Sequence, residues 1–230
     1  MKKIITLLAL VLFASSAQAG QFGVGVTGNI AAIAAQGTEA DKNGAADDSG
    51  RSATASNNAF VGSVFAEYSM DNGFTLGVNH IPGSADISAK KFTRVDVSQN
   101  AASGGAGSDD RTNTAQAEIE NYMSVYAEIP LHAGMYVKGG YVEMDVNTLE
   151  TSNLAGAGTY GNQTVDGLQW GLGYRSSFGS NGFYKVEGSH TEYDSLSLTS
   201  TKTVSTGDKA NVITADLDVT KLTFAVGLNF

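Results

Sequence analysis

The chain has 230 residues, no cysteine, 28 glycines and a formal net charge of −9 at pH 7. A length of this order fits one domain, which must be stabilised without disulfides. With 23 acidic against 14 basic residues and no basic aromatic patch, the chain repels phosphates, so we do not expect a nucleic-acid partner.

The first segment has the layout of a secretory signal peptide. Two lysines form a positive start, a mostly apolar run covers residues 4–13, and small residues at 17–19 offer a cleavage site. A membrane anchor is the alternative, but the run falls short of the roughly 20 residues that cross a bilayer as a helix. We therefore expect residues 1–19 to be removed and residues 20–230 to form the mature domain.

Eight segments of the mature chain alternate large apolar residues with small or polar ones, and this period of two predicts β-strands. In chain order these segments are 22–30, 60–70, 74–80, 119–129, 135–141, 168–174, 184–190 and 222–230. Their connections alternate in length. Tight turns are expected near Asp71, Pro130 and Gly179. The long connections, rich in small and polar residues, are 34–57, 82–116, 148–164 and 198–211.

Two of these segments leave alternatives open. In the fifth strand, Val142 and Met144 fit the opposite face, which predicts a bulge or a weak register. In the second long connection, Ile87, Phe92, Val95 and Val97 can extend the third strand. We favour that extension, with the basic cluster of Lys90, Lys91 and Arg94 solvated, over contact of this cluster with lipopolysaccharide phosphate.

The last strand ends the chain at Phe230 and would expose an adhesive edge unless it were paired. Pairing with the first strand closes a barrel and removes the edge. An even strand number, with tight turns at one end and long loops at the other, is typical of a bacterial outer-membrane barrel. The predicted fold is therefore all-β: an eight-stranded antiparallel up-and-down transmembrane β-barrel with short periplasmic turns and long extracellular loops. A soluble barrel with its apolar residues inside is the alternative.

The residues on the polar face of the strands favour a membrane barrel over a soluble one. If the apolar face contacts lipid, the lumen-facing set holds four acidic and four basic residues, in a space that side chains fill. Buried charges must pair, so we expect a connected acid–base network rather than solvated rim charges. The expected members are Glu67, Glu120, Glu128, Lys138, Arg175, Lys185, Glu187 and Lys221.

Taken together, the leader, the eight strands, the alternating turn lengths and the terminal Phe230 resemble the small outer-membrane barrels of the OmpA/OmpX and Opa type. The resemblance covers nearly the whole mature chain and rests on pattern rather than on a unique motif. It implies that a paired-charge lumen blocks or gates a continuous pore. It also implies that the barrel-assembly machinery reads an assembly signal carried by Leu222, Phe224, Val226, Leu228 and Phe230.

No residue pattern indicates a catalytic, cofactor or metal site. His80, His132 and His190 are far apart in sequence. Acidic residues follow His190 at 192 and 194, and a carboxylate near a histidine is a common feature of general-base catalysis. We nevertheless favour an ordinary histidine at the barrel rim. The acidic stretch 41–48 lacks the spacing of a calcium loop.

Three functions follow, in this order of expectation. The first is a non-enzymatic surface barrel that supports envelope integrity or binds an extracellular ligand through its loops. The second is a narrow channel for ions or small solutes, and the third is a lipid-modifying or proteolytic enzyme. The expected location is the bacterial outer membrane, and the expected partners are its lipid and lipopolysaccharide, with the assembly machinery during biogenesis. The apolar outer face has no obvious interface, so we expect a monomer.

Overall fold

The computed structural model describes residues 20–40, 51–96, 111–152, 159–201 and 210–230. The predicted signal peptide lies outside this part of the chain. No helix among the described residues is long and apolar enough to span a bilayer. The strands are β1 (Gly20–Ala40), β2 (Arg51–Met70), β3 (Thr75–His80), β4 (Ala85–Asp86), β5 (Phe92–Asp96), β6 (Arg111–Pro130), β7 (Met135–Ser152), β8 (Gln163–Phe178), β9 (Gly182–Tyr193), β10 (Leu196–Thr199) and β11 (Val212–Asn229).

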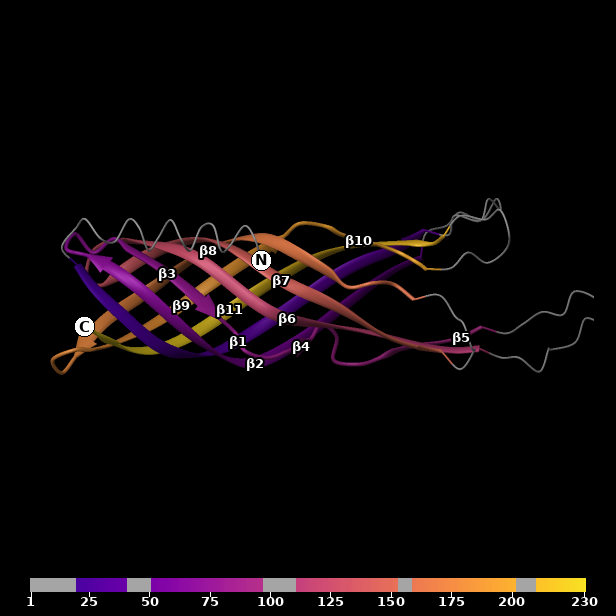
Figure 1. Ribbon diagram of the computed structural model, residues 1–230, viewed down its shortest axis with the longest axis horizontal. Helices are drawn as coiled ribbons and strands as arrows, with labels where there is room; N and C mark the ends of the chain where they lie inside the picture. The colour runs from indigo at the N-terminus through magenta and orange to yellow at the C-terminus, as the bar shows by residue number, and fades with distance from the viewer. Residues whose placement is uncertain (1–19, 41–50, 97–110, 153–158, 202–209) are drawn as a thin grey trace, which may run out of the picture.

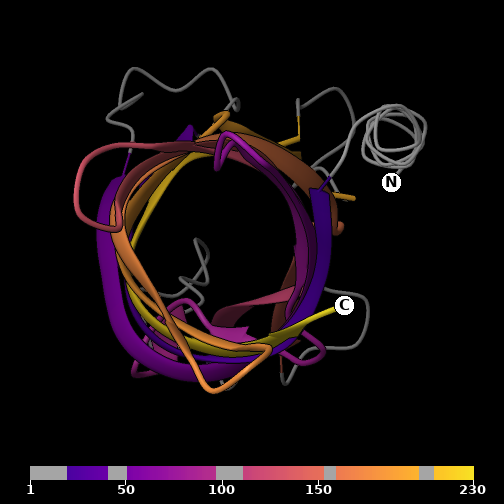
Figure 2. The same ribbon diagram turned by 90° about the vertical axis from the view of Figure 1, so that its left-hand side faces the viewer.

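Eight strands form a closed antiparallel ring in the order β1-β2-β3-β6-β7-β8-β9-β11, and β11 pairs with β1. Figure 2 looks along this ring, and Figure 1 shows the strands crossing its axis obliquely. The closing register runs from Gly23 opposite Asn229 to Ala40 opposite Val212. The predicted fold class and the predicted partner of the last strand are thus confirmed.

The predicted tight turns gather at one end of the ring, where the C-terminus also lies (Figure 1). Gly73, Gly134 and Gly179 have φ values of 83°, 82° and 60°. Glycine adopts this left-handed conformation at no steric cost, which explains its place in each turn. In the first turn, the Asn72 side chain also accepts a hydrogen bond from the Phe74 backbone N–H at 2.9 Å.

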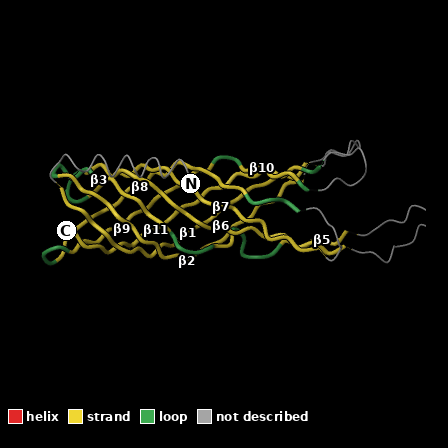
Figure 3. Tube along the Cα trace, in the orientation of Figure 1, coloured by secondary structure: helices red, strands yellow, loops and turns green. Residues whose placement is uncertain are grey.

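At the other end the strands continue well beyond the predicted limits. Residues 31–40, 51–59, 142–152 and 212–221 are strand. Of these, 34–40, 51–57 and 148–152 lie in segments that the sequence predicted to be long connections. β5 pairs with the upper part of β6, so the strand extension predicted in the second long connection is confirmed for Phe92 and Val95, whereas Ile87 lies between β4 and β5 and is not in a strand. β10 pairs in the same way with the upper part of β11. Val97 lies outside the described residues. Figure 3 shows strand, rather than loop, over most of the described chain at this end.

The two ends of the barrel bury different residues, as β11 illustrates. Near the turns, Leu222, Phe224 and Val226 face outward and are 41–53% exposed, and Lys221 faces inward. Further from the turns the outward residues become polar, while Leu217 and Val219 face inward and are buried. Side chains of β11 alternate between inside and outside without interruption. On the turn side of Lys221 the outer surface of β11 is apolar, and on the other side of Lys221 the inner surface is apolar.

One β-bulge interrupts the β6–β7 ladder between Glu120 and Met123. Asn121 adopts a φ of 52° there, a conformation in which Asn is enriched. Its side chain donates to Asp145 at 2.9 Å, and hydrogen bonds from Thr164 and then Asn121 lower the pKa of Asp145. The irregularity predicted for the fifth strand therefore lies in its neighbour β6.

Candidate functional site

The lower lumen, which is the part of the barrel interior nearest the tight turns, contains a buried group of ion pairs. Lys185 on β9 places its ammonium 2.6 Å from Glu67 Oε2 and 2.7 Å from Glu128 Oε1. Arg175 on β8 pairs with the other oxygen of Glu67. Both carboxylates are 2% exposed. Strands β2, β6, β8 and β9 thus supply one compact group, held by charge-assisted hydrogen bonds.

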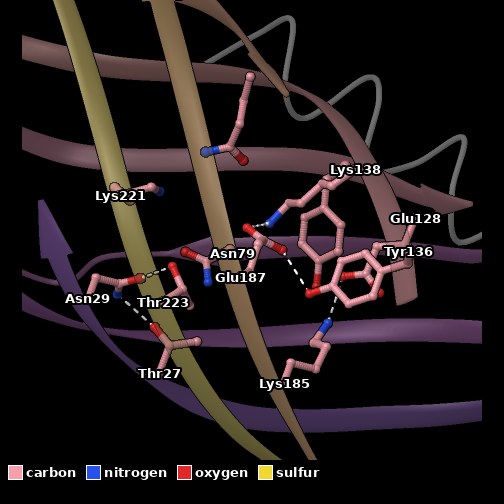
Figure 4. Close-up of polar contacts among 12 residues, drawn as sticks. Thr27, Asn29, Asn79, Glu128, Tyr136, Lys138, Lys185, Glu187, Lys221 and Thr223 are labelled. Carbon is pink, nitrogen blue, oxygen red and sulfur yellow. Dashed lines mark hydrogen bonds and ion pairs between the residues drawn. The ribbon is translucent and has the colours of Figure 1, made fainter. Parts of the chain in front are cut away.

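A second ion pair lies beside the first group. Lys138 on β7 contacts Glu187 Oε1 at 3.0 Å, and the Tyr136 hydroxyl donates to Glu187 Oε2 at 3.0 Å (Figure 4). The Tyr126 hydroxyl donates to Glu67 at 3.2 Å, and the Lys138 ammonium lies 4.1 Å from the centre of the Tyr126 ring. Tyr126 therefore connects the two groups, and Tyr136 satisfies the Glu187 oxygen that Lys138 does not contact.

Aromatic rings fill the lumen between these charges, and each lies against a glycine on the neighbouring strand. Tyr126 is paired with Gly77, and a Cβ added at that glycine would overlap the tyrosine ring. The same arrangement joins Tyr136 to Gly173. Further pairs are Phe65 with Gly25 and Phe183 with Gly227. These rings were not among the predicted site residues, although their inward phase was readable in the sequence.

The structure brings six of the eight predicted lumen residues into ion pairs. For Glu120 the prediction of a lumen position is wrong. The bulge at Asn121 shifts the phase of β6, so Glu120 faces outward and accepts a hydrogen bond from Asn147 at 2.7 Å. Lys221 does face the lumen, but its contact is the Tyr122 hydroxyl at 2.6 Å.

Above the charged group the interior is apolar. A buried core fills the barrel at this level, with members Ala31, Ile33, Ile87, Ile119, Tyr122, Val142, Met144, Val146, Val165, Tyr193, Leu196, Leu198, Leu217 and Val219. Beside the ion pairs lies a cavity of ≈ 20 Å³, lined by Lys138, Lys185 and Glu187 together with Lys221, Ser124 and Asn79 among others. That volume holds about one water molecule.

The histidines lie outside this group. His190 on the outer face bonds the Thr220 hydroxyl at 2.9 Å and packs 5.4 Å from the Trp170 ring centre. An open groove of ≈ 710 Å³ begins beside His190 and runs over small side chains such as Ala32 and Ser56. His80 contacts the Tyr122 carbonyl, and His132 is in a turn. The described residues contain no group of three ligands able to hold a metal ion, and the acidic stretch 41–48 lies outside them.

A band of exposed apolar side chains surrounds the lower barrel. They are 37–79% exposed, too contiguous for a surface that faces water. The band comprises Phe22, Val24, Val26, Ile30, Phe60, Val64, Ile129, Val137, Leu168, Trp170, Leu172, Tyr174, Tyr184, Leu222, Phe224, Val226 and Leu228. A polar, filled interior inside an apolar band is the arrangement that a bilayer requires of a β-barrel.

Solved structures show the same architecture. OprG from Pseudomonas aeruginosa, an outer membrane protein, aligns over 93% of this chain and 97% of its own, with a TM-score of 0.50 and 11% identity. The chain has the fold of the small outer-membrane β-barrel proteins. This barrel also aligns with the outer membrane protease OmpT from Escherichia coli, at a TM-score of 0.47 and 6% identity over 94% of this chain and 100% of the other.

A third similar barrel is Ail of Yersinia pestis, an attachment invasion locus protein, with a TM-score of 0.38 and 12% identity over 90% of this chain and 99% of the other. The sequence matches no protein-family profile. No curated protein sequence matches it significantly. The assignment as an outer-membrane barrel therefore rests on the fold and on the apolar band.

Proposed function

We propose that this protein is a non-conducting outer-membrane barrel that carries a β-sheet extension above the membrane for contacts at the cell surface. The observation that supports the proposal is the filling of the lumen at two successive levels, by buried ion pairs and then by buried apolar side chains. The cavity beside the ion pairs, of ≈ 20 Å³, has room for about one water molecule and is smaller than a hydrated ion.

The extension supports the surface role. Above Lys221, β11 continues from Val212 to Thr220, which at about 3.3 Å per residue adds roughly 30 Å along the strand. Because the tight turns mark the periplasmic end of such barrels, the extension points out of the cell. Backbone pairing continues along it, as in Thr38 opposite Thr214, so the paired sheet itself reaches beyond the membrane.

Planar-bilayer recording tests the closed lumen. The refolded mature chain is expected to show no steady openings, and Lys91→Met, which changes an exposed lysine outside the lumen, serves as the matched control. Steady wild-type openings that grow in Lys138→Met would contradict the proposal and favour the narrow channel.

The surface role needs a separate test in cells. Deletion of the gene is expected to lower adhesion or raise detergent sensitivity, and re-expression of the full chain should restore the lost property. If neither property changes, the surface role is wrong even when the barrel is silent in the bilayer.

Assembly is the second part of the proposal. We propose that residues 1–19 direct export and that the terminal strand guides insertion. In support, its five apolar residues face outward, and Phe230 exchanges backbone hydrogen bonds with Phe22 at 2.8 and 3.3 Å. Deletion of Phe230 should lower the yield of heat-modifiable barrel in cells, while folding into detergent in vitro continues. An unchanged cellular yield would contradict this role.

A further inference from the structure

Lys221 is the lumen cation that lacks a carboxylate within ion-pair distance among the described residues. Its side chain is buried. Its ammonium donates to the Tyr122 hydroxyl at 2.6 Å and lies 4.4 Å from the centre of the Tyr122 ring. Lys138, Lys185 and Arg175 each contact at least one carboxylate. Figure 4 shows Lys221 on β11, apart from the Lys138–Glu187 pair.

The bulge in β6 explains this imbalance. With Glu120 turned outward, the described lumen around the charged group contains three carboxylates and four cations, counting Lys221. The other inward carboxylates that the structure describes, Glu39 and Glu150, contact Tyr160 on the far side of the apolar core. A buried ammonium with no countercharge is costly, so this excess charge calls for an anion.

Two buried polar atoms beside Lys221 also lack a protein partner. Ser189 is paired with Lys221 across the β9–β11 ladder, and its hydroxyl has no hydrogen-bond partner in the structure. Gln169 donates to the same Tyr122 hydroxyl at 3.4 Å, and its Oε1 atom is unpartnered. Gln169 and Ser189 are 3% and 4% exposed. Neither residue lines the cavity beside Lys221, so these two atoms show only that protein groups do not satisfy every buried polar atom at this level of the lumen.

The space next to Lys221 limits the size of that molecule. The adjoining cavity of ≈ 20 Å³ is lined by Lys221, Thr223, Ser124 and Asn79, and Glu187 lies on its wall. Room for about one water-sized particle excludes carboxylates and phosphates, and the neighbouring carboxylate disfavours a second negative charge.

We propose that Lys221 binds a small monovalent inorganic anion, of the chloride or bromide class, in this cavity inside the barrel. The ammonium donates to the anion, and the polar side chains of Asn79, Ser124 and Thr223 form part of the cavity wall around it. The anion neutralises the excess lumen charge and becomes enclosed as the barrel closes. The site does not depend on the proposed surface role.

Anion-dependent unfolding of the mature barrel in detergent micelles tests the site. Sodium bromide is titrated against sodium glutamate at constant ionic strength. The wild-type melting temperature should rise saturably, by roughly 5–10 °C at a hundredfold excess over the dissociation constant. Lys221→Met should remove the rise, and Lys91→Met should keep it. No bromide-specific rise, or the same rise in Lys221→Met, would overturn the proposal.

Crystals grown in bromide give a second result that does not depend on any variant. An anomalous peak within hydrogen-bond distance of Lys221 Nζ supports the site, and an ordered Lys221 without a peak overturns it. Ultraviolet absorbance identifies the rival countercharge. If one tyrosine of the folded wild type is ionised at pH 8 and is lost in Tyr122→Phe, tyrosinate neutralises Lys221 and the anion proposal is wrong.

Discussion

The lower barrel and its upper extension use the same strands with opposite interiors. In the lower barrel apolar residues such as Phe224 face outward and ion pairs lie inside. In the extension polar residues such as Asp218 face outward, and Leu217 and Val219 lie inside. The medium outside explains the difference, because lipid accepts apolar side chains and water accepts polar ones. The same alternation of side chains thus serves both regions, and the medium around each region, lipid or water, determines which face is apolar.

The two interiors also differ in how they are stabilised. The upper core gains stability from apolar burial, as in a soluble protein. The lower interior contains charges whose desolvation only their partners offset. Removing one partner should therefore cost more in the lower region than truncating an apolar side chain costs in the upper one.

The largest effect is expected from Lys185→Met. This change leaves Glu67 and Glu128 buried without their shared ammonium, so the free energy of unfolding should fall by about 3–5 kcal/mol. Urea unfolding of the barrel in lipid vesicles measures it, with exposed Lys91→Met as the control. A loss below about 1 kcal/mol would mean that the ion pairs are solvated, as surface pairs are.

A smaller, local effect is expected in the extension from Met144→Ala. Met144 is 1% exposed, and its truncation should cost about 2–5 kcal/mol, felt as local opening of the upper strands. Hydrogen exchange should quicken there while the heat-dependent gel shift of the lower barrel persists. Leu149→Ala, on the exposed side of the same strand, is the matched control. Faster exchange throughout the barrel would show that the two regions unfold as one unit.

The smallest effect concerns the ring-on-glycine packing. Gly77→Ala forces the Tyr126 ring off its place, which should cost about 1–3 kcal/mol. Gly139→Ala, whose new Cβ meets nothing within 4 Å, should be close to neutral. Urea unfolding of both variants checks the difference. Equal stability would show that the lumen is loosely packed.

The sequence predicted the strand number, the pairing of the ends and the facing of most side chains, because alternation is strong where one face contacts lipid. It underestimated strand length. In residues 31–40 and 51–59 small and polar residues predominate, and such composition resembles loop. The signal that could have revealed these strands is the inward phase of Ile33, which continues the phase of Thr27 and Asn29.

Two other differences come from long-range structure. Glu120 was assigned to the lumen because alternation was followed straight through Asn121, where the bulge reverses the phase. Val142 and Met144 were read as a change of register in the fifth strand. Both residues point into the barrel, as Lys138 does, because the barrel interior changes from charged to apolar along this strand. The ion pairs join strands remote in sequence, so composition could indicate them but not specify partners.

Depth scanning along β11 tests the exchange of inner and outer surfaces most directly. The chain has no cysteine, so single cysteines at 214, 216, 218, 220, 222, 224 and 226, all outward, can each carry a nitroxide label. In lipid vesicles, accessibility to a water-soluble relaxant should be high up to Thr220 and low from Leu222, with oxygen showing the reverse. A boundary several residues away, or a gradual change along the whole strand, would contradict the account.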